Sequence, residues 1–375
     1  MNIVIAPDSY KGSLTSSDAS SIMKKAVMEI YPDAFVLLKP MADGGEGTLE
    51  SLVTATSAVT VTTKCTGPLG NQISTTYGII DGKTAVIEYA KIAGLFQVAK
   101  AKRNPDLTTS YGLGEVILHA LDKGCTAFIV GLGGSATNDG GLGMLQALGM
   151  KSIDASNRHT GPYGKDLLHI KEVDVTGLDK RLSKVRINVA CDVDNPLCGN
   201  RGASIVYGPQ KGATSEQVKK YDEALDFYSN LIESKINKSV KGTPGSGAAG
   251  GLGFAFLVLG AELVSGAELV GNTMDLETAI RNADFVLTGE GQSDEQTLYG
   301  KAPGYVATLA RKYNVPAVLI SGSLKENSDV LRESFSGCFS IINKPITLEE
   351  SMEKADQYLY EQTKQIFHLI SSIRK

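Results

Sequence analysis

The feature that most constrains the fold is an alternation of apolar runs and helical patterns at both ends of the chain. Residues 2–6 form a short apolar run, and a helical pattern separates it from a second run at residues 35–38. The same alternation returns towards the C-terminus. Strands that alternate with helices are typical of a parallel sheet covered by helices. We therefore predict an α/β, flavodoxin-like parallel-sheet domain that combines residues 1–60 with residues 270–375.

The middle of the chain begins differently, with three consecutive strand patterns. Residues 58–63, 73–80 and 84–90 are rich in strand-forming side chains, and Gly-Pro-Leu-Gly and Asp-Gly turns join them. We expect an antiparallel meander there, followed by further helices and strands. The sequence thus predicts a second, mixed α/β domain that is inserted at residues 61–269.

Composition limits the classes of partner. The 375 residues carry a formal net charge of −4 without a basic stripe, so we expect no nucleic-acid partner. No run approaches the ~20 apolar residues that cross a bilayer, so we expect no membrane segment. The five cysteines form no C-x-x-C pair, and the four histidines add no zinc pattern, so we expect a cytoplasmic protein with reduced thiols. The oligomeric state stays open, with a homodimer as one option.

A glycine-rich loop at residues 131–141 follows an apolar strand pattern and precedes a helical one. Glycine lets backbone N–H groups converge on an anion, and the N-terminus of a helix adds a positive dipole. Hydroxyls, an amide and a carboxylate in the same loop suit a phosphate with a metal ion beside it. The alternative is a turn that lets a helix pack closely on a strand. We predict phosphate contacts from Gly133, Gly134, Ser135, Thr137 and Asn138.

Acidic residues recur just after apolar runs. They are Asp8, Asp43, Glu46, Asp139, Asp192, Asp194, Glu290 and Asp294. Each alone fits a helix cap or a turn. Gathered at one sheet edge they would repel one another without a cation, and Mg²⁺ takes carboxylate oxygens while keeping waters and substrate phosphates. None of the four histidines lies in a glycine-rich or acid-rich loop, so a carboxylate is the expected general base.

Basic residues near these loops could neutralise a phosphate or a carboxylate. Lys11 follows the first strand pattern and Lys301 follows the acidic segment near residue 290, although either could be a solvated surface lysine. Arg103 and Arg201 are candidates for bidentate binding of a carboxylate. A G-x-x-x-x-G-K-[ST] motif is lacking, and no G-x-S-x-G frame surrounds the serine of the glycine-rich loop.

Several phrases, spread in order over nearly the whole chain, resemble the bacterial glycerate kinases. They are APDSYKG at 6–12, MADGGEGT at 41–48, GLGGSATNDGG at 131–141, CDVDNPL at 191–197, GAAGGLG at 247–253 and TGEG at 288–291 with the later Gly-Lys at 300–301. The resemblance implies a two-domain enzyme that phosphorylates D-glycerate with ATP and Mg²⁺. It favours 2-phosphoglycerate over 3-phosphoglycerate as the product.

The resemblance also suggests roles for individual residues. Direct phosphoryl transfer would use Asp192 as general base and Lys11 as a second catalytic residue. Glycerate would contact Asp8, Asp43 and Arg103. The nucleotide or its phosphates would contact Gly250, Gly251, Glu290 and Lys301 besides the glycine-rich loop. Asp139 and Asp194 would hold the metal, and the assignments of Asp192 and Asp194 could be exchanged.

Two other functions stay open. The run Gly-Leu-Gly-Gly-Ser-Ala also echoes a loop of the galactokinase–homoserine kinase superfamily, so the substrate could be another small hydroxy acid or a sugar. A non-catalytic protein that binds a sugar acid is the second alternative, and it would not need so many acids at strand ends.

Overall fold

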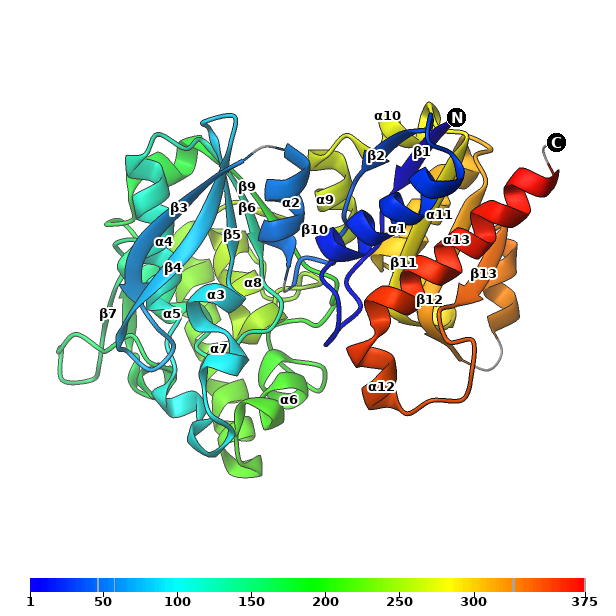
Figure 1. The fold of residues 1–375 in the computed structure, drawn as a ribbon. Coiled ribbons are helices and arrows are strands. Elements are labelled where there is room, and N and C mark those ends of the chain that lie inside the picture. The colour runs from blue at the N-terminus through cyan, green and yellow to red at the C-terminus, as the bar shows by residue number, and fades with distance from the viewer. Residues whose placement is uncertain (46, 57, 326–327, 374–375) are drawn as a thin grey trace. The chain divides into compact units, whose positions relative to one another are not determined.

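The computed structural model describes residues 1–45, 47–56, 58–325 and 328–373, so the predicted acidic residue Glu46 lies outside the described residues. Contacts between residues divide the chain into two compact units. Unit 1 comprises Met1–Asp43, Glu50–Ser57 and Ser265–Lys375, and unit 2 comprises Gly44–Leu49 and Ala58–Val264. Both chain ends therefore belong to unit 1 (Figure 1).

Unit 1 contains a five-stranded sheet in which every pair of neighbouring strands is parallel. Its strands are β1 (Asn2–Ile5), β2 (Phe35–Leu38), β11 (Phe285–Ser293), β12 (Ala317–Leu324) and β13 (Gly337–Ser340), in the spatial order β13-β12-β11-β1-β2. Counted along the chain, this is the order 2-1-3-4-5 of flavodoxin-like sheets. The predicted flavodoxin-like fold is thus confirmed, although β13 begins two residues before the expected start at residue 339.

Helices cover both faces of this sheet (Figure 1). On one face α1 packs against α13, and on the other α11 packs against β11 and β12 beside α9 and α10. The helices of the unit are α1 (Ser16–Ile30), α9 (Gly266–Thr273), α10 (Leu276–Arg281), α11 (Ala302–Lys312), α12 (Leu348–Glu353) and α13 (Ala355–Ile373), together with α2 (Thr48–Thr56), whose first two residues belong to unit 2. A single closing helix over residues 348–371 was the wrong expectation, because the backbone leaves helical geometry at Lys354.

Unit 2 contains a six-stranded mixed sheet with the order β10-β9-β6-β5-β4-β3. Its strands are β3 (Val59–Thr66), β4 (Gln72–Ile80), β5 (Thr84–Glu88), β6 (Ala127–Gly131), β9 (Arg186–Ala190) and β10 (Glu262–Val264). The expected meander is confirmed, since β3, β4 and β5 pair antiparallel, whereas β5, β6, β9 and β10 pair parallel. A separate pair, β7 (Lys151–Ile153) with β8 (Glu172–Asp174), has strands too short for sequence periodicity to reveal.

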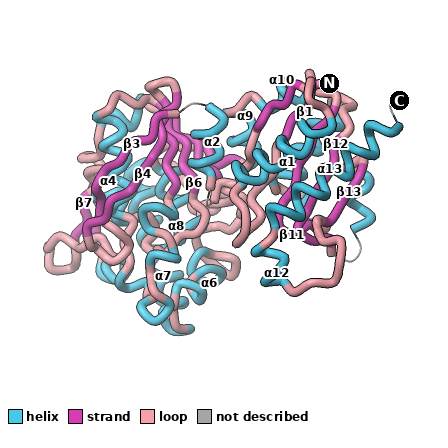
Figure 2. The backbone as a smooth tube through the Cα atoms, in the orientation of Figure 1, coloured by secondary structure: helices cyan, strands magenta, loops and turns pink. Residues whose placement is uncertain are grey.

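The α-helices of unit 2 lie in the connections that follow β5 along the chain, where the strands of its main sheet pair parallel (Figure 2). They are α3 (Ala90–Ala93), α4 (Tyr111–Asp122), α5 (Leu142–Ala147), α6 (Ala203–Tyr207), α7 (Ser215–Ile236) and α8 (Ala248–Val258). A regular helix over residues 248–263 was also expected and is wrong. Three residues in the first turn of α8, namely Ala249, Gly250 and Gly251, have positive φ, and the helix ends at Val258.

Candidate active site

The acidic residues of unit 1 gather where the strand order reverses. Asp8 follows β1, and Glu290 lies near the carboxyl end of the neighbouring strand β11. The backbone N–H of Asp8 donates to the Gly289 carbonyl at 2.8 Å, which fixes the start of this loop against β11. In open parallel sheets, ligands bind outside the carboxyl ends of the strands at such a reversal.

Charge repulsion and burial act together on Asp8. Its side chain is almost fully buried, and burial raises the pKa of Asp8 to about 7, with further increases from the charges of Asp43 and Glu290. A hydrogen bond from the Ser9 amide and the charge of Lys11 oppose this rise. The Lys11 ammonium lies 3.4 Å from Asp43 Oδ2, and that carboxylate raises the pKa of Lys11. The structure therefore brings together Asp8, Lys11, Asp43 and Glu290.

Glu290 is held by several donors. Its Oε1 accepts hydrogen bonds from the Ser293 hydroxyl at 3.0 Å and the Thr297 hydroxyl at 2.6 Å, and its Oε2 lies 3.3 Å from the Lys301 ammonium. Glu290 and Lys301, which were predicted separately, are thus in contact. Sequence reasoning missed Ser293 and Thr297, for which the only signal was their position three and seven residues after Glu290. Asp294 instead caps a short 3₁₀ helix and pairs with Lys325.

The glycines of the loop at residues 131–141 permit close backbone approach. A Cβ added to Gly131 would lie 2.5 Å from the Gly44 carbonyl oxygen, and one on Gly133 would lie 2.5 Å from Gly45 Cα. From the other side, a Cβ on Gly250 would lie 2.1 Å from the carbonyl oxygen of Thr137. Side chains larger than glycine would therefore separate the loop from the two segments that pack on it. This agrees with the alternative interpretation of the loop, a turn that lets neighbouring segments pack closely.

Asp139 anchors this loop from inside. Its buried carboxylate accepts four hydrogen bonds, from the Ser110 amide and hydroxyl at 2.8 and 2.6 Å and from the amides of Gly141 and Gly143 at 3.2 and 3.3 Å. Burial raises the pKa of Asp139, while these bonds lower it. The carboxylate therefore occupies the N-terminus of α5, where a phosphate was expected to benefit from the helix dipole.

A buried lysine that the sequence did not point to lies under the same loop. The Lys211 ammonium donates to the Thr137 carbonyl oxygen at 2.5 Å, and its side chain is 2% exposed. Burial lowers the pKa of Lys211 to about 7, although the charge of Asp139 opposes the shift. Lys211 is the last residue of a 3₁₀ helix, Pro209–Lys211, and three residues are too few for apolar periodicity to mark it as buried.

Other loop side chains join this buried network. The hydroxyls of Tyr89 and Thr137 lie 2.9 Å apart, and the Asn138 amide nitrogen donates to the Ser204 hydroxyl at 2.9 Å. Asn138 Oδ1 is buried and finds no donor in the described part of the chain. The predicted phosphate contacts of Thr137 and Asn138 therefore compete with a structural role, whereas Ser135 at 8% exposure lies nearest to solvent of the three.

The remaining predicted residues of unit 2 lie on exposed or half-buried segments. Asp192 and Asp194 follow β9 and are exposed. Asp194 Oδ1 accepts from the Arg201 guanidinium at 2.6 Å, so Arg201 contacts a carboxylate of its own chain. Arg103 donates to the carbonyl oxygen of Val98 at 3.3 Å and to that of Leu95 at 3.5 Å. Within the described ranges, no group of three or more His, Cys, Asp or Glu side chains is arranged to hold a metal ion.

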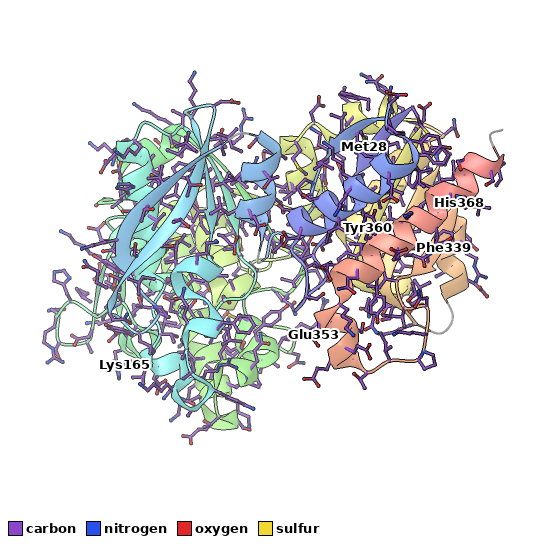
Figure 3. All side chains as sticks on the ribbon, viewed as in Figure 1. Met28, Lys165, Phe339, Glu353, Tyr360 and His368 are labelled. Atoms are coloured by element: carbon purple, nitrogen blue, oxygen red, sulfur yellow. The ribbon has the colours of Figure 1, made fainter. Side chains whose placement is uncertain are left out.

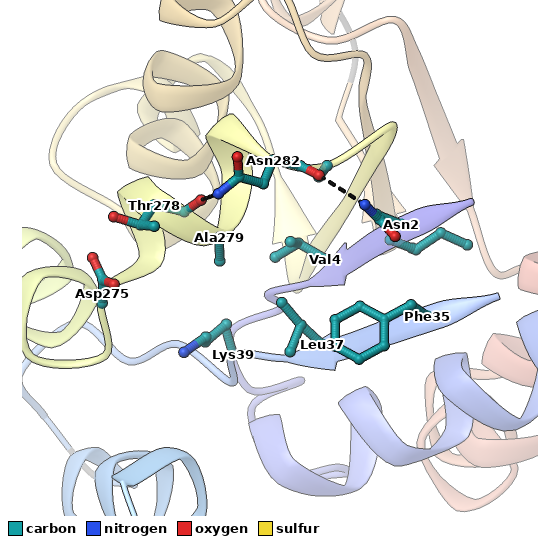
Figure 4. A pocket seen from close by; sticks show the side chains of 11 residues that line it. Asn2, Val4, Phe35, Leu37, Lys39, Asp275, Thr278, Ala279 and Asn282 are labelled. Atoms are coloured by element: carbon teal, nitrogen blue, oxygen red, sulfur yellow. Dashed lines mark hydrogen bonds between the residues drawn. The ribbon is translucent and has the colours of Figure 1, made fainter.

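One pocket of unit 1 is separate from these residues. Figure 4 shows this pocket of about 300 Å³, which is lined by residues of β1, β2 and α10. Its one lysine, Lys39, donates to the Met274 carbonyl oxygen at 2.6 Å, and burial lowers the pKa of Lys39. None of the predicted site residues within the described ranges lines it.

Comparisons with known proteins identify the family. The model of the glycerate kinase family matches residues 3–371. The chain belongs to the glycerate kinase family. A glycerate kinase of Haemophilus influenzae is 44% identical over 374 residues, covering 99% of both chains. A glycerate 2-kinase of Escherichia coli is 46% identical over 358 residues, covering 95% of this chain and 94% of its own.

A solved structure supports the same assignment. A crystal structure described as that of a glycerate kinase 2 from Salmonella typhimurium LT2 has a TM-score of 0.91 and 44% identity, and the match covers 100% of this chain and 99% of that chain. The family resemblance and the fold class expected from the sequence are thus confirmed, and the protein is a kinase. Among the helices of the described residues, none has the length and apolar character needed to cross a bilayer.

Proposed function

We propose that this protein transfers the γ-phosphoryl group of ATP to D-glycerate and that the product is 2-phosphoglycerate. The observation that carries the proposal is the match, over 95% of the chain, to a relative named glycerate 2-kinase at 46% identity. The acid-rich sheet edge of unit 1 and the glycine-rich loop of unit 2 supply the residue types that phosphoryl transfer needs, namely charged groups that position the reactants and stabilise charge.

We assign the site residues as follows. Asp8, Asp43 and Arg103 position glycerate, and Lys11 stabilises charge on the transferred group. Asp192 takes the proton of the attacking hydroxyl. Asp8 is the second candidate for this base, because its pKa of about 7 suits proton transfer near neutral pH. The nucleotide is held by Gly133, Gly134, Ser135, Thr137, Asn138, Gly250, Gly251, Glu290 and Lys301.

Mg²⁺ fits this chain best as part of the nucleotide complex. Because no three potential ligand side chains group together among the described residues, the ion would take most of its ligands from phosphates and water. Both oxygens of the predicted ligand Asp139 already accept hydrogen bonds, which leaves the exposed Asp194 as the more accessible carboxylate. When bound, Mg²⁺ neutralises charge on the β- and γ-phosphates.

The test is ³¹P NMR of the products formed from ATP, Mg²⁺ and D-glycerate. We expect a phosphomonoester whose proton coupling identifies C2 as the phosphorylated carbon. Asp192→Asn should lower kcat by about 10²- to 10⁴-fold with little change in KM. Asp33→Asn, at an exposed aspartate, serves as the matched control.

Three outcomes would contradict the proposal. Near-normal turnover by a folded Asp192→Asn protein would exclude Asp192 as the base. Consumption of ATP only with another hydroxy acid or a sugar would exclude glycerate as the substrate. Binding of glycerate without any turnover would instead indicate a sugar-acid-binding protein.

A further inference from the structure

A second pocket, which lies wholly within unit 2, is lined by positive charge. It has a volume of about 710 Å³, and its lining includes the side chains of Lys102, Arg103 and Lys165. No carboxylate is among the lining residues that the structure describes. Pockets that bind small organic ligands commonly have volumes of about 300–1,000 Å³. The size and the single sign of charge both suit an anionic organic molecule.

The cations of this pocket are not paired with carboxylates in the described part of the chain. None of the three forms an ion pair with another described residue. Two nearby carboxylates are engaged elsewhere: Asp106 accepts from the Tyr221 hydroxyl at 2.7 Å, and Asp166 accepts from the Tyr163 amide at 2.9 Å. Like charges around one cavity repel one another, so a bound anion would relieve an unfavourable interaction.

The orientation of the charged groups is partly fixed. The Arg103 guanidinium is held by the carbonyl oxygens of Val98 and Leu95, and the Leu95 amide in turn donates to the Gly134 carbonyl oxygen at 2.8 Å. This chain of bonds joins the pocket to the glycine-rich loop. Lys165 lies at the surface of unit 2 (Figure 3), with its ammonium 5.8 Å from the centre of the Tyr163 ring.

The walls are also closely packed. A Cβ added to Gly212 would lie 2.0 Å from the Arg103 carbonyl oxygen, and one on Gly164 would lie 2.2 Å from the Pro105 carbonyl oxygen. The Gly164 amide donates to the Thr108 carbonyl oxygen at 3.0 Å. The two segments that carry the cations therefore hold each other in place, so the pocket exists before a ligand arrives.

The rest of the lining is apolar or aromatic. Leu69 is half-buried, Leu107 is 48% exposed, and the Tyr163 ring lies beside them in the same lining. Inorganic phosphate would leave these side chains without a partner, whereas the organic part of a phosphate ester would cover them.

We propose that this pocket binds an organic phosphate, with the phosphate group held by Lys102, Arg103 and Lys165 and the organic part against Leu69, Leu107 and Tyr163. The ester could be the nucleotide substrate or a phosphorylated acid, and the test separates these sources. This proposal rests on the proposed function at one point only, because both assign a role to Arg103. The variants in the test therefore leave Arg103 unchanged.

The experiment measures equilibrium binding by titration calorimetry, without turnover. The probes are ATP, 2-phosphoglycerate and inorganic phosphate. The wild-type chain is compared with the double variant Lys102→Gln/Lys165→Gln and with the control Lys100→Gln/Lys123→Gln, which removes two exposed lysines outside the pocket lining. All the substituted side chains are exposed, so each variant is expected to fold, and circular dichroism verifies this.

We expect the pocket variant to bind at least one of the two esters about tenfold more weakly, while the control stays within about twofold of wild type. A loss for ATP alone assigns the pocket to the nucleotide, and a loss for 2-phosphoglycerate alone assigns it to a phosphorylated acid. Unchanged affinities, equal losses in the control, an effect on inorganic phosphate only, or no binding by wild type would each overturn the proposal. If the protein does not turn over glycerate but still binds an ester in a way that depends on these lysines, the proposed function is wrong and the proposal for the pocket stands.

Discussion

Lys211 offers a direct measurement of how burial controls charge in unit 2. Its side chain is 2% exposed, and burial lowers the pKa of Lys211 from its ordinary 10.5 to about 7. Between these two values the unfolded chain binds a proton at Lys211 that the folded protein does not bind. The free energy of unfolding should therefore rise with pH over this interval, because proton binding stabilises the unfolded state less as the proton concentration falls.

The size of the effect follows from proton linkage. With a pKa of about 7 in the folded state and 10.5 in the unfolded state, the lysine should add about 2 kcal/mol to the free energy of unfolding between pH 7 and pH 9. Lys211→Met removes the titrating group but keeps an unbranched side chain. The free energy of unfolding of the wild type should thus gain about 2 kcal/mol over that of the variant across this interval.

Urea unfolding at pH 7, 8 and 9 measures this difference. Far-UV circular dichroism is the suitable signal, since the chain contains no Trp. Lys123→Met, at an exposed lysine beside the end of α4, is the matched control, and we expect its difference from wild type to be independent of pH. A difference between wild type and Lys211→Met that stays constant from pH 7 to pH 9 would refute the reasoning.

Three further substitutions test other parts of the structure by the same unfolding assay. The raised pKa of Asp8 makes the stability of the wild type fall as pH rises. Between pH 5 and pH 8, the unfolding free energy of Asp8→Asn should therefore increase by about 2–3 kcal/mol relative to that of the wild type. A difference that does not depend on pH would contradict this. Gly250→Ala should cost more than Gly260→Ala, since both positions have positive φ but only the first would clash, at 2.1 Å, with a backbone oxygen; equal costs would show that φ alone matters. Ser110→Ala should cost about 2–3 kcal/mol, because it removes two buried hydrogen bonds, and a cost below about 1 kcal/mol would argue that water replaces the hydroxyl.

Most of the fold could be predicted because its signals are local. The alternation at both chain ends indicated a parallel sheet, and the turns near Gly70 and Asp81 indicated the meander of β3, β4 and β5. The errors have tertiary causes. The sequence at the start of α8 predicts a regular Gly/Ala helix. Its backbone instead has positive φ where Gly250 packs against Thr137, which lies in a distant part of the chain.

The site was predictable to the extent that strand ends reveal it. Asp8 and Glu290 were found because each lies near the carboxyl end of an apolar strand, and the parallel sheet brings neighbouring strand ends together. Ser110 and Lys211 were missed for the opposite reason. Their partners lie 29 and 74 residues away in the chain, and neither occurs in a pattern that distinguishes a buried polar residue from an exposed one.

Asp8 and Lys211 illustrate why residue type alone could not reveal the charge state of buried ionisable groups. They carry opposite charges when ionised, yet burial moves the pKa of each to about 7, because a low-dielectric surrounding disfavours the charged form whatever its sign. The pKa of the Asp8 carboxyl group is raised, so increasing pH should lower the stability of unit 1. The pKa of the Lys211 ammonium is lowered, so increasing pH should raise the stability of unit 2. Because the pKa of each group is about 7, a pH profile of activity alone would not separate the two groups. The opposite signs of their effects on the free energy of unfolding would distinguish them.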